Sequence, residues 1–199
     1  DRAEILRQWS TVNPEFLFLP RKFKIAICSA EQDRAAIQVH DIGLYLYPGP
    51  SGEMLLRVLV GGGLGRTPIL GQQICEDLPW QHLLSYVEAI LRVYNRYGRR
   101  DNKYKARIKI LVKALGIEAF KQEVEQEWEQ IKTGPAELTF AEYQRVSTAF
   151  SQPDYLNLPE QDLDYHTHIY MDDDFARWVS STVSAHKTPG YVVVTLSTK

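Results

Sequence analysis

The chain has 199 residues, of which 44% are hydrophobic and 24% are charged, with a net charge of −2 at pH 7. This composition suffices for a hydrophobic core and excludes a disordered or fibrous protein. No apolar run approaches the roughly 20 residues that span a bilayer, and no signal peptide precedes the first amphipathic segment, so we expect a cytoplasmic protein without membrane association.

The first part of the chain is predicted to form a helix end and three strands. An amphipathic segment over 3–10 stops at Asn13-Pro14. Strand-like runs follow at 21–29, 37–47 and 53–60, and the loop PGPSGE joins the second and third. The third run leads directly into Gly61, Gly62 and Gly63, so the strand is expected to end there.

Helices dominate the middle of the chain. Apolar residues recur at helical spacing over 79–97, 103–115 and 117–132, and glycines end the first two of these segments. Thr139 and Glu142 form a capping box, which predicts a shorter helix that ends at Phe150.

The last quarter of the chain has a different pattern. Residues 151–171 contain two prolines and no steady period, which predicts a linker. A helix is predicted over 172–186, followed by a strand in the segment YVVVTLS. The order of elements predicts an α+β fold with a mixed or antiparallel sheet and packed helices. We expect one domain over 1–150, a linker over 151–171 and the start of a second domain over 172–199.

The stretch FLPRKFKIA, residues 18–26, places three cations in an otherwise apolar segment. In a strand, residues two apart share a face at a separation of about 6.6 Å, so Lys22 and Lys24 would point one way and Arg21 the other. Two ammonium groups at this spacing repel one another unless an anion lies between them. The alternative is an exposed edge strand whose lysines deter pairing with another chain.

The stretch VGGGLGRTP, residues 60–68, is a second candidate for ligand binding. Its glycines allow close approach of a ligand, and free backbone N–H groups bind carboxylates or phosphates. Arg66 and Thr67 add a guanidinium and a hydroxyl. The stretch lacks the Gly-Lys-Ser/Thr of a Walker loop, and a flexible loop without a ligand is the alternative.

The stretch RYGRRDNKYKARIK, residues 96–109, contains seven cations and one acid. The predicted helix places its basic residues on two faces, with Lys105, Lys109 and Lys113 on one and Lys103 and Arg107 on the other. A nucleic-acid-binding patch and a solvated helix face both account for such a run. The slightly acidic chain and the few aromatic residues argue against nucleic acid.

Charge and cysteine content narrow the choice of ligand. Residues 1–113 carry 17 Lys and Arg against 11 Asp and Glu, whereas residues 114–199 carry 6 against 14, so we expect an anionic ligand on the first half. Cys28 and Cys75 lie far apart and are most simply buried thiols. The pair His166 and His168 suggests either a metal site or, more commonly, exposed residues near a linker.

Five stretches together resemble the sulfite/nitrite reductase hemoprotein family. In chain order they are EILRQWS, LPRKFKIA, HDIGL, VLVGGGLGRTP and NKYKARIKILVKALGIEAFK. The resemblance extends over residues 3–125, and LPRKFK in combination with VGGGLGRTP is its specific part. The segment GYVVVTLS, after a Trp-bearing helix, is similar to the opening of the second ferredoxin-like repeat of that family.

The resemblance implies siroheme coupled to a 4Fe–4S cluster, and the multi-electron reduction of sulfite to sulfide or of nitrite to ammonia. It implies that Lys22 and Lys24 are catalytic residues that bind the anion, and that Arg21 helps to hold the carboxylates of siroheme. The other implied cofactor-binding residues are Gly61, Gly62, Gly63, Arg66, Thr67, Lys103, Lys105, Arg107 and Lys109. Electrons would come from ferredoxin or from an NADPH-dependent flavoprotein.

The sequence departs from the family pattern in two respects. The four cluster cysteines of the family, in a Cys-x5-Cys and a Cys-x3-Cys pair, do not occur, and its other substrate-binding arginines would lie before Asp1. Because the chain also starts without Met, we expect a fragment of a reductase that binds no metal or cofactor alone and is inactive alone. A non-catalytic anion- or nucleic-acid-binding module and a degenerate scaffolding homologue are the alternatives.

Overall fold

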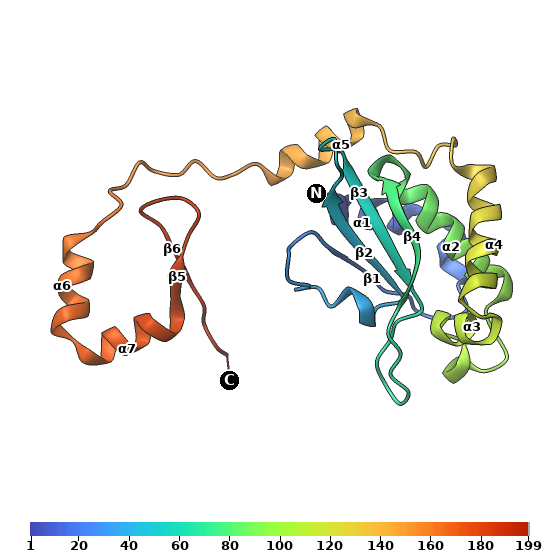
Figure 1. The fold of residues 1–199 in the computed structure, drawn as a ribbon, viewed down its shortest axis with the longest axis horizontal. Coiled ribbons are helices and arrows are strands. Elements are labelled where there is room, and N and C mark those ends of the chain that lie inside the picture. Colours follow the sequence, from blue (N-terminus) through green and yellow to red (C-terminus); the bar gives the residue numbers. More distant parts are fainter. Residues whose placement is uncertain (199) are drawn as a thin grey trace. The chain divides into compact units, whose positions relative to one another are not determined.

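The computed structural model describes residues 1–198 and divides into two compact units, Asp1–Phe150 and the segment from Ser151 onward (Figure 1). The first unit combines a mixed sheet with packed helices, which confirms the predicted α+β class. Its strands are β1 (Ile25–Cys28), β2 (Ile42–Pro48), β3 (Met54–Val60) and β4 (Gln72–Pro79). Its α-helices are α1 (Arg2–Val12), α2 (Leu83–Tyr97), α3 (Ile108–Leu115), α4 (Ile117–Ile131) and α5 (Phe140–Ser147). Among the described residues, no helix is both long and apolar enough to cross a membrane.

The sheet has the strand order β1-β2-β3-β4, with β1 parallel to β2 and the other neighbours antiparallel. Side chains that oppose one another across β2 and β3, such as Leu44 and Val58, are buried together on the core face. Tyr45 and Arg57, one residue along, oppose one another on the outer face and are half-buried. The period of two in these strands therefore decides which side chains enter the core.

Helix α2 is central to the first unit, and α4 packs against it (Figure 1). Tyr86, Ile90 and Tyr94 of α2 are fully buried, as is Phe120 of α4. Each such side chain contributes about 1.5–3 kcal/mol through removal of apolar area from water. The buried core formed by the sheet, α2 and α4 thus supports the loops at the ends of the strands.

Two strand predictions need correction. β1 begins only at Ile25, so residues 21–24 lie before the strand. The predicted strand over 37–47 begins only at Ile42, because residues 37–39 form a 3₁₀ turn. The exposed carboxylate of Asp33 accepts the N–H of Ile37 at 2.9 and 3.1 Å, and Ala36 is left-handed with a φ of 51°, which together favour the turn.

In the first unit, β4 was not predicted, and the helix predicted over 103–115 begins later than expected. β4 is an edge strand with mainly polar residues and a left-handed Asp77, so it lacks a regular apolar alternation. Residues 103–105 form a 3₁₀ turn, capped where the Asn102 side chain accepts the N–H of Tyr104, and α3 starts only at Ile108. Lys105 therefore lies outside the helix, and the prediction of one lysine face with Lys109 is wrong.

The second unit contains α6 (Leu163–Met171), α7 (Asp173–Thr182) and an antiparallel hairpin of β5 (Val183–Ala185) with β6 (Val192–Val194). The predicted linker is irregular only up to Asp162, whose carboxylate accepts two N–H groups and caps α6. The predicted helix over 172–186 ends at Thr182, because the next residues pair with β6. The similarity to a ferredoxin-like repeat stays a prediction.

Candidate anion- and cofactor-binding site

The predicted lysine pair lies on the extended segment that leads into β1. Lys22 and Lys24 are exposed, whereas Arg21 and Phe23 are half-buried, so the side chains alternate as predicted although this segment is not part of the strand. Phe23 stacks against the buried Tyr94 of α2 at a centroid distance of 6.2 Å. Among the described residues, the ammonium groups of Lys22 and Lys24 have neither an acidic partner nor a hydrogen bond.

Two side chains, Arg21 and Tyr94, donate hydrogen bonds to backbone carbonyls at and just after the turn at 103–105. The Arg21 guanidinium donates a hydrogen bond to the carbonyl of Lys103 at 2.7 Å. The Tyr94 hydroxyl donates to the carbonyl of Ala106 at 2.6 Å, and burial raises the Tyr94 pKa to about 12. The Tyr94 hydroxyl therefore stays protonated and can donate at physiological pH. Through Arg21 and Tyr94, residues 21–24 are joined to residues 103–106.

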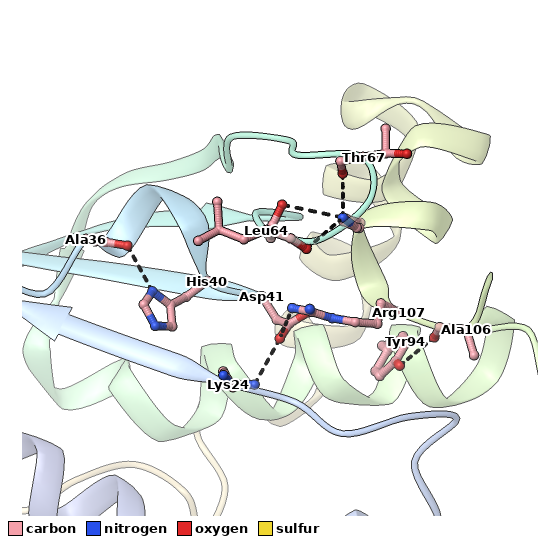
Figure 2. Close-up of polar contacts among 11 residues, drawn as sticks. Lys24, Ala36, His40, Asp41, Leu64, Thr67, Tyr94, Ala106 and Arg107 are labelled. Atoms are coloured by element: carbon pink, nitrogen blue, oxygen red, sulfur yellow. Dashed lines mark hydrogen bonds and ion pairs between the residues drawn. The ribbon is translucent and has the colours of Figure 1, made fainter. Parts of the chain in front are cut away.

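A buried carboxylate that we did not predict as a site residue lies at the centre of the site (Figure 2). Asp41, immediately before β2, is 1% exposed. Its Oδ1 accepts the Arg107 Nε at 3.1 Å and Nη2 at 2.8 Å, and its Oδ2 accepts Nη2 at 2.8 Å. Oδ2 also accepts the backbone N–H of Lys24 at 3.0 Å. These charge-assisted bonds offset the cost of the buried charge.

The Lys109 side chain is buried and points toward the glycine-rich loop. It is 8% exposed, and its ammonium donates to the carbonyl of Thr67 at 2.6 Å and, more weakly, to those of Leu64 and Gly63 at 3.3 and 3.4 Å. Burial and the nearby Arg107 guanidinium lower the Lys109 pKa, whereas Asp41 opposes this shift. Lys109 thus holds the glycine-rich loop from beneath.

The glycine-rich loop forms a tight hairpin whose base is packed against the 3₁₀ turn at 37–39 and the residue after it. A Cβ on Gly62 would lie 2.3 Å from the Gln38 carbonyl oxygen and 2.5 Å from that of His40, so no side chain fits there. Gly63 and Ile69 exchange two backbone hydrogen bonds at 2.9 and 3.0 Å. Residues 64–68 at the tip, which include Arg66 and Thr67, are exposed.

Two backbone N–H groups of the glycine-rich loop are not free. We expected the loop to offer free N–H groups to a ligand, but Gly61 donates to the Asp41 carbonyl at 3.0 Å and Gly63 donates to Ile69. Arg107 and Lys109 are likewise occupied within the chain. The exposed cations at the site are Lys22, Lys24, Arg66, Lys103 and Lys105.

The histidine pair and the two cysteines were the other candidates for ligand binding. Among the described residues, no group of three or more His, Cys, Asp or Glu is placed to bind a metal ion. His168 contacts the Asp164 carbonyl within α6. Cys28 is buried and Cys75 is half-buried, and both are free thiols.

One feature of the sequence could have identified Asp41 as a site residue. It is the only acid between Asp33 and Glu53, and it directly precedes an apolar strand. An acid in such a position requires a buried partner, but its spacing in the sequence does not identify that partner.

Comparison with known proteins identifies the family of the chain. Residues 1–132 match the family described as "Nitrite and sulphite reductase 4Fe-4S domain". The chain belongs to this family. This match confirms the resemblance to the sulfite/nitrite reductase family, which was seen over residues 3–125 of the sequence.

Relatives of this reductase-family chain carry names of the same kind. It is 38% identical over 135 residues to sulfite reductase (ferredoxin) 1 of Mycolicibacterium paratuberculosis, covering 67% of the chain and 24% of the relative. It is 32% identical over 130 residues to the sulfite reductase (NADPH) hemoprotein beta-component of Chromohalobacter salexigens, covering 61% of the chain and 22% of the relative. The chain thus spans about a quarter of the length of these relatives.

A solved structure also resembles the fold. The Mycobacterium tuberculosis NirA protein superposes with a TM-score of 0.58 at 29% identity, over 65% of this chain and 24% of that protein. The shared α+β arrangement agrees with the family assignment.

Proposed function

We propose that this chain is the part of a sulfite or nitrite reductase that holds one side of siroheme and binds the substrate anion. The observation that carries the proposal is the set of five exposed cations, Lys22, Lys24, Arg66, Lys103 and Lys105. They project from a framework that Asp41, Arg107 and Lys109 hold together.

The residues of the site fit a carboxylate-fringed tetrapyrrole. Exposed lysine and arginine side chains without acidic partners supply charge-assisted hydrogen bonds to carboxylates. An open cavity of about 560 Å³ beside β1 is lined by Arg7, Arg21, Lys22 and mainly apolar side chains, and the other exposed cations of the site lie outside its lining. Apolar walls with a few charged groups suit a flat macrocycle with a charged rim. We assign Lys103, Lys105 and Arg66 to the rim, and Arg107 and Lys109 to the framework.

The two lysines would act on the anion. When bound, siroheme and its cluster would supply the iron centre and the electrons for reduction. Lys22 and Lys24 would hold the oxygens of sulfite or nitrite through charge-assisted hydrogen bonds. Each ammonium also carries a proton that an oxygen needs in order to leave as water, and solvent can replace this proton because both side chains are exposed.

The chain does not fit the 4Fe–4S cluster. Cys28 and Cys75 are its only cysteines, whereas the family pattern uses four. We therefore assign no cluster ligand to this chain and expect the chain alone to be inactive. We further propose that the complete enzyme receives electrons from ferredoxin or an NADPH-dependent flavoprotein, the two donors that occur in the names of the relatives.

A nucleic-acid-binding role is less well supported. Three arginines in the basic run are occupied: Arg96 pairs with Glu127, Arg99 pairs with Asp101, and Arg100 donates to the Phe18 carbonyl. The run therefore does not present a continuous row of free cations for phosphates.

The test is to produce the full-length enzyme that contains this chain in cells that synthesise siroheme. We expect a coloured, iron-containing protein with a Soret band that reduces sulfite or nitrite with reduced methyl viologen. A colourless, iron-free protein would refute the proposal. Tight, salt-sensitive binding of DNA by that protein would instead support the nucleic-acid alternative.

A further inference from the structure

Asp41 contacts all three basic stretches of the site. Its carboxylate binds the Lys24 backbone and the Arg107 guanidinium (Figure 2). Its carbonyl accepts the N–H of Gly61. We infer that Asp41 is a positioning residue whose buried carboxylate fixes the Lys24 backbone and thereby sets where the Lys24 ammonium meets an anion. This inference rests on the proposed function, in which Lys24 binds the substrate.

The carboxylate extends the sheet by one position. The parallel pairing of β1 and β2 begins at Ile25 and Ile42, and the Ile42 N–H donates to the Lys24 carbonyl at 3.1 Å. A strand partner for the Lys24 N–H would next be a backbone carbonyl, but the Asp41 Oδ2 takes that place at 3.0 Å. Residues 41 and 42 thus bind both polar groups of the Lys24 backbone, while its side chain is exposed.

Arg107 keeps the carboxylate in this orientation. Its bidentate contact fixes both oxygens of Asp41, and a bidentate pair is more directional than a single hydrogen bond. Asp41 in return neutralises one of the cations that crowd this region, which include Lys24 and Lys109. Removal of the carboxylate would therefore free the Lys24 N–H and leave the Arg107 charge without its partner.

Hydrogen exchange provides a direct readout in the 199-residue chain. In Asp41→Asn, we expect the Lys24 amide to exchange about tenfold faster or more, because it loses a hydrogen bond to a charged acceptor. The Leu44 amide, inside β2, should change much less and reports general loosening. Asp33→Asn is the matched control, since this exposed carboxylate also accepts a backbone N–H in the same loop. Equal acceleration at Lys24 and Leu44 would indicate a merely structural role and overturn the inference.

Kinetics of the siroheme-loaded full-length enzyme provide the second readout. We expect Asp41→Asn to lower kcat/KM for sulfite or nitrite about 10- to 100-fold, mainly through KM, with an unchanged Soret absorbance per chain. Asp33→Asn should match the wild type. If Lys24→Ala abolishes activity but Asp41→Asn leaves KM and Lys24 exchange unchanged, the inference fails and the proposed function stands. If Lys24→Ala has no effect, the proposed function fails.

A second variant guards against misfolding of Asp41→Asn. The double variant Asp41→Asn/Arg107→Gln leaves no unpaired charge at the buried position. We expect it to fold and to show faster Lys24 exchange, because a neutral amide oxygen is a weaker acceptor than a carboxylate. Wild-type exchange at Lys24 in this variant would overturn the inference.

Discussion

Gly62→Ala tests whether close backbone packing shapes the glycine-rich loop. The added Cβ would lie 2.3 Å from the Gln38 carbonyl oxygen and 2.5 Å from the His40 carbonyl oxygen. Both neighbours are backbone atoms, so the loop must move by about 1 Å, and such overpacking costs about 1–3 kcal/mol. We expect a loss of this size in the free energy of unfolding of the Asp1–Phe150 unit.

Gly71→Ala is the matched control at the other end of the loop. Its added Cβ would meet its nearest neighbours at 3.4 Å, an ordinary contact distance, and loss of the glycine can even stabilise the fold by about 0.4–1 kcal/mol. Urea unfolding can be followed by tryptophan fluorescence in a Trp178→Phe background, so that the other tryptophans report on the first unit. Equal unfolding midpoints for the two alanine variants would refute the packing argument.

Three further predictions concern charged side chains. Lys22→Ala or Lys24→Ala should lower kcat about 100- to 1000-fold in the siroheme-loaded full-length enzyme and leave the Soret band intact; loss of the band would contradict their assignment to the substrate. Lys109→Met should destabilise the fold by about 1–3 kcal/mol in urea unfolding, because three loop carbonyls each lose a hydrogen bond from the ammonium. The exposed control Lys113→Met should change stability by less than about 0.5 kcal/mol, and equal effects would refute the role of Lys109. Burial opposes ionisation of Glu127, but hydrogen bonds from two arginines of α2 lower its pKa below the usual value. The contribution of ionised Glu127 to folding stability is fully present above its unfolded-state pKa and is lost as pH falls through its folded-state pKa. Glu127→Gln should therefore destabilise the fold at pH 7 and much less at about pH 3. An equal loss at both pH values in urea unfolding would contradict this.

The sequence predicted the elements whose patterns are local. The apolar period of α2 and α4 and the capping box at Thr139 each correspond to an observed helix. β4 was missed because its single buried face is short and interrupted by Asp77. The start of α3 was misplaced because Asn102 caps a separate turn, a choice that helical periodicity does not reveal.

The candidate site shows the same division. The alternation of residues 21–24 predicted that Lys22 and Lys24 point the same way, and both are exposed in the structure. The glycine run predicted close approach to a ligand, whereas Gly62 packs against backbone carbonyls of the chain itself. Which cations are available, however, depends on partners distant in the chain. Arg107 and Lys109 looked like Lys103 and Lys105 in the sequence, yet they are held by Asp41 and by the carbonyls of the loop.

The sequence by itself therefore determined the fold class and the location of the basic segments, because these depend on residue type and spacing along the chain, and its resemblance to known reductases indicated the family. Only the tertiary structure decided that Asp41 joins those segments, since its contacts to Lys24 and Arg107 span 17 and 66 positions. A buried charge must find its counter-charge in space, and the sequence around it does not state where the folded chain will place one.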